Sequence, residues 1–84
     1  MHIEIITPDK QVFSGEISLI QVPGSKGSFE VLHNHAPIIS TLEEGKIKIY
    51  TQDKKTKYFE IESGLIEVKN NNIILLAEKL KEVA

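Results

Sequence analysis

The fold class is decided by residues 45–61, which read GKIKIYTQDKKTKYFEI. Ile47 and Ile49 alternate with lysines, which is the period-two pattern of a strand with one buried and one solvated face. After a polar segment the alternation returns at Phe59 and Ile61. The stretch therefore predicts a β-hairpin whose apolar side chains share one face.

Similar alternating segments fill the rest of the chain, from Ile3 and Ile5 near its start to Ile73 near its end. Turn signals such as Thr7-Pro8-Asp9-Lys10 and Asn70-Asn71-Asn72 separate these segments at intervals of roughly 8–12 residues. Over 84 residues this spacing predicts roughly seven to ten short strands. We expect one all-β domain over residues 1–84, folded as a small two-layer antiparallel β-sandwich.

Two segments depart from simple alternation. Ile17 and Leu19 point to one side and Ile20 and Val22 to the other, so we expect a β-bulge or a strand covered on both faces. At the C-terminal end, Leu76, Leu80 and Val83 are spaced i, i+4, i+7, which predicts a short helical stub.

Composition excludes several classes of function. The chain contains no cysteine, so disulfides, thiolate metal sites and a cysteine nucleophile are excluded. Ten basic and twelve acidic residues give a net charge of −2, so no basic field would attract nucleic acid. The longest apolar run, residues 73–77, is far shorter than a membrane span. We expect membrane contact only through other proteins.

Two segments contain residue types that could form a chemical site. His33 and His35 have a spacing that would place both rings on one side of a strand, but no third ligand is marked and Pro37 predicts a loop. A surface role is favoured over a metal site. Residues 24–28, Gly-Ser-Lys-Gly-Ser, lead into a strand-like segment and not into a helix, so they indicate a hairpin turn and not a phosphate loop. We predict no catalytic residue, no cofactor and no small-molecule substrate.

Lys54, between Asp53 and Lys55 at the tip of the predicted hairpin, suggests an alternative function. Lipoyl carrier domains present an Asp-Lys pair on such a tip, but they flank it with small and apolar residues, which are absent here. A solvated lysine-rich turn that prevents aggregation is the simpler interpretation. A lipoyl-type carrier and a generic β-sandwich binding module remain as alternatives.

Three stretches together resemble the N-terminal domain of the epsilon subunit of F-type ATP synthases, called delta in mitochondria. The first is residues 3–15, with Thr-Pro-Asp and the return Val-Phe-Ser-Gly. The second and most specific is residues 20–42, with QVPG, GSFEVL and His-Ala-Pro. The third is the segment Gly-Lys-Ile-Lys-Ile at 45–49, followed by residues 63–68 and 73–77. One departure is Asn34, where family members usually have glycine; asparagine also tolerates positive φ, so the turn should survive.

The resemblance implies a non-catalytic rotor subunit of the central stalk, coupling the gamma subunit to the membrane ring of c subunits. It would lie on the cytoplasmic face of the bacterial inner membrane as a peripheral subunit of a proton- or sodium-driven ATP synthase. By matching positions, the expected contact residues for the c ring or gamma are Lys26, Gly27, Ser28, Phe29, Glu30, His35, Ala36 and Pro37. We expect the last three to shape an edge neighbouring the first five. For Gly27, Pro37 and Gly45, backbone geometry alone is an equal alternative.

Two further expectations follow from the resemblance. Four glycines are expected at structural turns: Gly15, Gly24, Gly45 and Gly64. The family typically continues into a helical hairpin that acts as an inhibitory latch, and this sequence stops at Ala84. We therefore expect coupling without self-inhibition.

Overall fold

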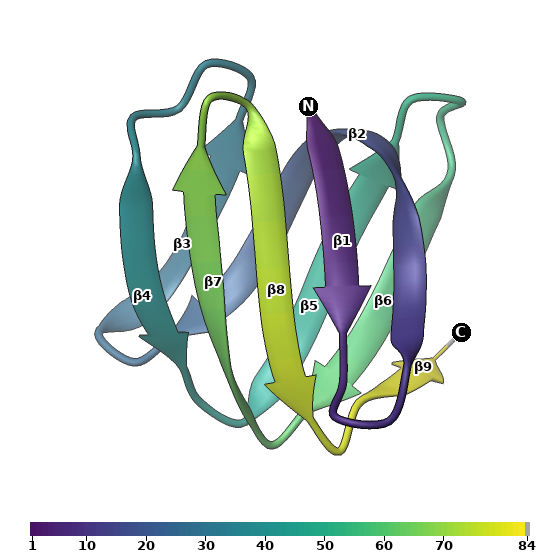
Figure 1. Cartoon of the computed structure of the whole chain (residues 1–84), viewed down its shortest axis with the longest axis vertical. Helices are drawn as coiled ribbons and strands as arrows, with labels where there is room; N and C mark the ends of the chain where they lie inside the picture. The colour runs from purple at the N-terminus through teal and green to yellow at the C-terminus, as the bar shows by residue number, and fades with distance from the viewer. Residues whose placement is uncertain (84) are drawn as a thin grey trace.

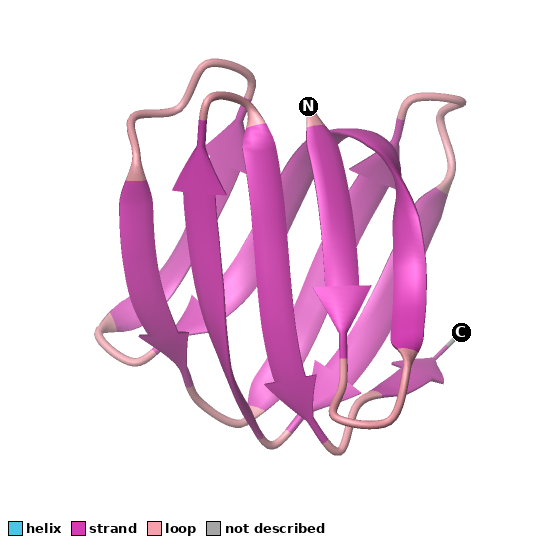
Figure 2. Ribbon diagram, viewed as in Figure 1, coloured by secondary structure: helices cyan, strands magenta, loops and turns pink. Residues whose placement is uncertain are grey.

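The structure is a computed structural model that describes residues 1–83, so the predicted domain end at Ala84 lies just outside the described residues. Residues 1–83 form nine strands and no helix (Figure 2). The strands are β1 (His2–Ile6), β2 (Gln11–Gly24), β3 (Gly27–Leu32), β4 (Ile38–Leu42), β5 (Gly45–Thr51), β6 (Thr56–Ile61), β7 (Ser63–Lys69), β8 (Asn72–Glu78) and β9 (Lys81–Val83). Among these residues no helix is long and apolar enough to cross a bilayer.

The strands form two layers that face each other (Figure 1). The front layer has the order β4-β7-β8-β1, with the first half of β2 paired to β1. The back layer has the order β3-β2-β5-β6-β9 and uses the second half of β2. The all-β sandwich is therefore confirmed. The prediction of a purely antiparallel arrangement needs one correction, because β1 and β8 pair in parallel. Strands β1 and β8 are far apart in the sequence, so no tight turn joins them and they can run parallel.

The long strand β2 joins the two layers. Its residues 11–16 pair with β1 in the front layer, and its residues 17–24 pair with β5 and β3 in the back layer. The register shifts between Ile17 and Leu19, where the strand changes layers. This irregularity lets both Ile17 and Ile20 point into the core, at 1% and 0% exposure, although they are three residues apart. The predicted bulge is confirmed.

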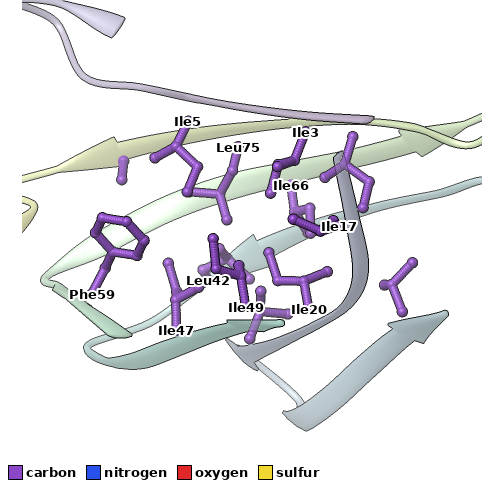
Figure 3. Close-up of a cluster of buried hydrophobic side chains, with 14 of the residues drawn as sticks. Ile3, Ile5, Ile17, Ile20, Leu42, Ile47, Ile49, Phe59, Ile66 and Leu75 are labelled. Atoms are coloured by element: carbon purple, nitrogen blue, oxygen red, sulfur yellow. The ribbon is translucent and has the colours of Figure 1, made fainter. Parts of the chain in front are cut away.

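The core fills the space between the layers with aliphatic side chains and one phenylalanine (Figure 3). Ile47, Ile49 and Phe59 contribute from the back layer, as the alternation of the predicted β5–β6 hairpin requires. Ile66 and Leu75 face them from the front layer. The exposed surface of 5151 Å² agrees with about 5,000 Å² expected for a folded chain of this mass.

The helical stub predicted from Leu76, Leu80 and Val83 is wrong. Leu76 belongs to β8, where the alternate residues Ile73, Leu75 and Ala77 are buried, so period-two burial overrides the helical spacing. Lys79 has φ 53°, which ends β8 in a left-handed conformation. Val83 then pairs with Tyr58 as part of β9, because the free edge of β6 supplies hydrogen bonds that a two-turn helix could not match.

Candidate protein-binding surfaces

The predicted contact segment 26–30 covers the β2–β3 turn and the first half of β3. Gly24 pairs with Gly27, and Ser25 and Lys26 form the two-residue loop between them. Gly27 has φ 127°, which L side chains rarely adopt, so a glycine is required here. Gly24 cannot carry a side chain either, since a Cβ would lie 2.6 Å from the Gly27 carbonyl oxygen. Lys26 is therefore exposed at the tip of a tight turn.

This turn is attached to the front layer. The Ser25 amide donates to the Thr41 carbonyl at 3.0 Å, and the Thr41 hydroxyl donates to the Ser25 hydroxyl oxygen at 2.9 Å. Gly24 also pairs with Leu42 of β4. A shallow groove lies next to the turn, lined by residues of β3 and β4 that include Phe29, Ile38 and Ile39. The turn is thus fixed at the side where the two layers meet.

The second predicted segment, His35-Ala36-Pro37, lies in the loop between β3 and β4. Asn34 has φ 64°, so the expected survival of this turn with asparagine in place of glycine is confirmed. The His35 amide donates to the Leu32 carbonyl at 3.1 Å, and its ring Nδ1 lies 2.7 Å from the Ala36 carbonyl oxygen. Ala36 and Pro37 are exposed, whereas His35 is half-buried.

The structure does not bring the two predicted segments together. They lie at opposite ends of β3, a six-residue strand that spans about 17–20 Å (Figure 1). The expectation that His35, Ala36 and Pro37 shape an edge neighbouring Lys26 is therefore corrected. The segments offer two separate contact areas at two ends of the sandwich.

The four glycines expected at structural turns occupy different positions. Gly24 closes the β2–β3 turn and Gly45 is the first residue of β5, so both border turns. Gly15 lies inside β2 opposite Ile3, and Gly64 is the second residue of β7 opposite Leu42 and Ala77. The turn assignment is wrong for Gly15 and Gly64, because neither is the first or last residue of its strand.

The outward surface of the front layer, here called the front face, carries apolar residues that the sequence interpretation did not single out. Strand pairing aligns Ile39, Glu67, Ile74 and Glu4 in one row across β4, β7, β8 and β1. The next row contains Thr41, Leu65, Leu76 and Ile6. Ile39 is 68% exposed, Leu76 45% and Ile74 38%. An available signal was the unbroken apolar run 73–77, because such a run predicts a strand that buries both faces.

The front face also contains a groove next to the β1–β2 turn. Residues from the β1–β2 turn and from β7 and β8 line it, including Ile6, Pro8, Leu65 and Leu76. In the two aligned rows the charged residues are the carboxylates Glu4 and Glu67. In these two rows the front face is therefore apolar with acidic groups among the apolar residues, which suits a protein partner better than bulk water.

The outward surface of the back layer, the back face, has a different character. Lys46 and Lys48 point outward from β5, with Tyr58 and Glu60 beside them on β6. The Lys46 ammonium lies 5.5 Å above the Tyr58 ring. Leu32 and Tyr50 are also exposed here, at 52% and 37%, in a row with the half-buried Leu19. Charged groups on β5 and β6 favour hydration of that part of the back face, and the row of Leu19, Leu32 and Tyr50 is its apolar part.

The β5–β6 hairpin tip contains Lys54, the residue of the lipoyl alternative, at φ 67° and fully exposed. The Thr51 hydroxyl donates to the Asp53 carboxylate and accepts the Lys55 amide at 3.0 Å. The hydrogen bond from Thr51 lowers the pKa of Asp53 below 3.8, with smaller contributions from Lys55 and Lys57. These contacts organise a tight turn and leave the lysine side chains in solvent.

His33 and His35 form no metal centre with other side chains. Within residues 1–83 no group of three histidine, cysteine, aspartate or glutamate residues is close enough to hold a metal ion. The candidate sites of this β-sandwich are thus protein-binding surfaces: the front face, the β2–β3 turn and the loop at residues 33–37.

Comparison with known proteins identifies the family of this sandwich. Residues 1–83 match the family model of the ATP synthase delta/epsilon chain, β-sandwich domain. The ATP synthase epsilon chain of Caulobacter vibrioides is 39% identical over 84 residues, a match that covers 100% of this chain and 96% of that one. The chain therefore belongs to the ATP synthase delta/epsilon family.

Solved structures agree at the level of the fold. A chain in the mitochondrial ATP synthase of Euglena gracilis, in an assembly of OSCP, F1 and c-ring, superimposes with a TM-score of 0.88 at 16% identity. That match covers 95% of this chain and 51% of the other. A chain in the central stalk and c-ring assembly of Tetrahymena thermophila gives a TM-score of 0.79 at 20% identity, covering 96% and 65%. Membership of the family also decides against a lipoyl carrier and a generic binding module.

Proposed function

We propose that this chain is a non-catalytic subunit of the central stalk of an ATP synthase, which couples the gamma subunit to the ring of c subunits. The observation that carries this proposal is the front face. Three large apolar side chains are exposed on one layer of a domain that belongs to the delta/epsilon family: Ile39 on β4, and Ile74 and Leu76 on β8, with β7 between the two strands. Leaving such a surface in water is unfavourable, and covering it with a partner removes that cost.

The gamma subunit is assigned to the front face. Burying one isoleucine or leucine side chain contributes about 1.5–3 kcal/mol, so the three exposed residues can supply much of the affinity of a stable subunit contact. Glu4 and Glu67 lie beside these residues and would pair with basic groups at the rim of the partner surface. The loop His35-Ala36-Pro37 continues directly into Ile38 and Ile39 of β4, and it therefore extends the same contact.

The c ring is assigned to the β2–β3 turn. Lys26, Ser28 and Glu30 are exposed polar groups on a turn that hydrogen bonds fix to β4. They are suited to polar loops, which is the chemistry expected where a membrane ring meets water. Through this turn the chain would be a peripheral subunit at the cytoplasmic face of the bacterial membrane, in contact with the bilayer only through its partners.

Transmission of torque requires stiffness. In this sandwich the strand β2 belongs to both layers, and a close-packed core lies between them. Close packing gives protein interiors low compressibility, so a force applied at the front face reaches the β2–β3 turn with little internal yielding. We propose that the sandwich by itself binds without inhibiting ATP hydrolysis.

Reconstitution tests the proposal. ATP synthase stripped of its own epsilon subunit should regain proton- or sodium-driven ATP synthesis when this chain is added, without a fall in ATP hydrolysis. The variant Ile39→Lys should fail to restore synthesis, whereas Tyr50→Lys on the back face should restore it. Failure of the unmodified chain to bind gamma would reject the proposed function. Marked inhibition of hydrolysis would reject only the statement that the sandwich does not inhibit.

A further inference from the structure

Two loops that are far apart in the sequence are joined by a reciprocal pair of hydrogen bonds at one end of the sandwich. The Asn34 amide donates to the Asn71 side-chain oxygen Oδ1 at 2.7 Å. The Asn71 side-chain nitrogen Nδ2 donates to Asn34 Oδ1 at 2.9 Å. The two residues are 37 positions apart, one in the β3–β4 loop and the other in the β7–β8 turn, whose loops lie side by side in Figure 1.

The backbone explains why both positions carry asparagine. Asn34 has φ 64° and Asn71 has φ 61°, in the left-handed region where most side chains are strained. Glycine would adopt these angles but has no side chain to bond across the gap. Asparagine is among the few residues that combine tolerance of a left-handed backbone with both a donor and an acceptor. Each asparagine thus adopts the left-handed backbone of its turn and also forms a hydrogen bond to the other loop.

The pair fixes a loop that otherwise has few attachments. Asn34 immediately precedes His35, and Ala36 and Pro37 are exposed. On the other side, the Asn71 carbonyl accepts the His2 amide at 2.9 Å, which ties the β7–β8 turn to the start of β1. The pair therefore connects the β3–β4 loop to three strands of the front layer: β7, β8 and β1.

We propose that Asn34 and Asn71 form an interloop clamp that positions His35, Ala36 and Pro37 for binding of the gamma subunit. This inference rests on the proposed function, because it assigns the residues that hold one part of the proposed gamma contact in place. A loop held in its bound conformation loses less conformational freedom on association, and binding is correspondingly tighter. Asn34 and Asn71 are positioning residues, since they act through the loop.

A graded set of variants separates the clamp from general loop stability. Asn71→Gly keeps the backbone angle and removes both hydrogen bonds, whereas Asn34→Gly removes one. Asn34→Asp tolerates the same backbone and retains a carboxylate oxygen that accepts from Asn71, so it should behave like the unmodified chain. Asn70→Gly is the matched control, because Asn70 lies in the same turn at φ 52° but takes no part in the pair.

Two measurements test the proposal: hydrogen exchange of the Asn34 amide, and the Kd for the isolated gamma subunit by calorimetry. For Asn71→Gly we expect exchange about tenfold faster and a Kd about five- to tenfold higher, since a tenfold change corresponds to one ordinary hydrogen bond. Asn34→Gly should raise the Kd less, and Asn34→Asp and Asn70→Gly should leave both quantities unchanged.

Each contrary result has a distinct meaning. Unchanged Asn34 exchange in Asn71→Gly would show that no clamp exists. Faster exchange with an unchanged Kd would show that the clamp does not position the loop for binding, and this would overturn the proposal. If the unmodified chain did not bind gamma at all, the proposed function and the positioning role would both be rejected, while the exchange series would still decide whether the clamp exists.

Discussion

The two outer faces of the sandwich differ although they cover the same core. On the front face the row across β4, β7, β8 and β1 contains two isoleucines and two glutamates. On the back face Lys46 and Lys48 occupy the corresponding outward positions of β5. Side chains that point inward from both layers are alike, being mainly isoleucine, valine and leucine.

This difference distinguishes the residues that stabilise the fold from the residues that are available to bind a partner. Stability requires only that one face of each layer is apolar, and both layers meet that requirement. Among the additional apolar residues of the front face, Ile39 is 68% exposed and contributes little to folding, while Ile74 and Leu76 leave 38% and 45% of their surface uncovered. The proposed partner would cover them, whereas the lysines of the back face are suited to contact with solvent.

The largest effect on stability is expected from a core residue that packs between the two layers. Phe59 is 1% exposed, with its ring 6.5 Å from that of Phe13, and it lies between the layers. Phe59→Ala should lower the free energy of unfolding by about 3–5 kcal/mol, because it leaves a cavity in the common core. Hydrogen exchange should then show the two layers losing protection together. Loss of protection in the back layer alone would mean that the layers fold independently.

The next effect concerns the front face alone. Ile39→Lys should raise the Kd for gamma about 10- to 100-fold, because a side chain worth about 1.5–3 kcal/mol on burial is replaced by a charge. The melting temperature should hardly change, since Ile39 is 68% exposed. Tyr50→Lys on the back face is the matched control. Equal losses of affinity in the two variants would remove the distinction between the faces.

A smaller effect is expected at the tip of the back-layer hairpin. Thr51→Val removes the hydrogen bond that holds the pKa of Asp53 below 3.8, so that pKa should rise toward 3.8 in an NMR titration. A carboxyl group whose pKa is lower in the folded than in the unfolded state stabilises the fold at pH values above its unfolded pKa. This stabilisation is lost as the pH falls through the folded-state pKa. The unmodified chain should therefore lose more stability below about pH 4 than Thr51→Val does. Thr56→Val, in the same hairpin, should leave the titration unchanged.

The smallest effect is expected from a back-face lysine. Lys46→Ala removes an exposed cation–π contact with Tyr58 and should cost about 0.5–1 kcal/mol in chemical denaturation. The affinity for gamma should stay the same, because Lys46 lies on the face opposite to the proposed contact. A clear loss of affinity would place gamma on the back face instead.

Most of the fold could be predicted from local pattern. Alternation at Ile47, Ile49 and Phe59 predicted the β5–β6 hairpin, and the phase change at Ile17 predicted the bulge, because burial of one face imposes a period of two. The helical stub failed because Leu76 and Val83 fit a helical spacing by coincidence. The parallel pairing of β1 with β8 depends on contacts between the two ends of the chain, which no local pattern encodes.

The candidate surfaces were predicted less completely. Motif resemblance indicated the segments at Lys26 and His35, but it could not show that β3 holds them apart. The front face was missed because its residues come from several strands and become adjacent only through pairing. The Asn34–Asn71 clamp likewise depends on two turns that meet only in the folded chain.

Mapping the contact with gamma onto the two faces distinguishes the front face from the back face as the surface that binds the stalk. Amide resonances of the labelled chain would be recorded by NMR while unlabelled gamma subunit is added. We expect the largest changes around Ile39, Ile74 and Leu76 and in the loop at residues 33–37, with Lys46 and Lys48 unaffected. Changes centred on the back-face lysines, or no changes at saturating gamma, would contradict the assignment of the front face as the surface that binds the stalk.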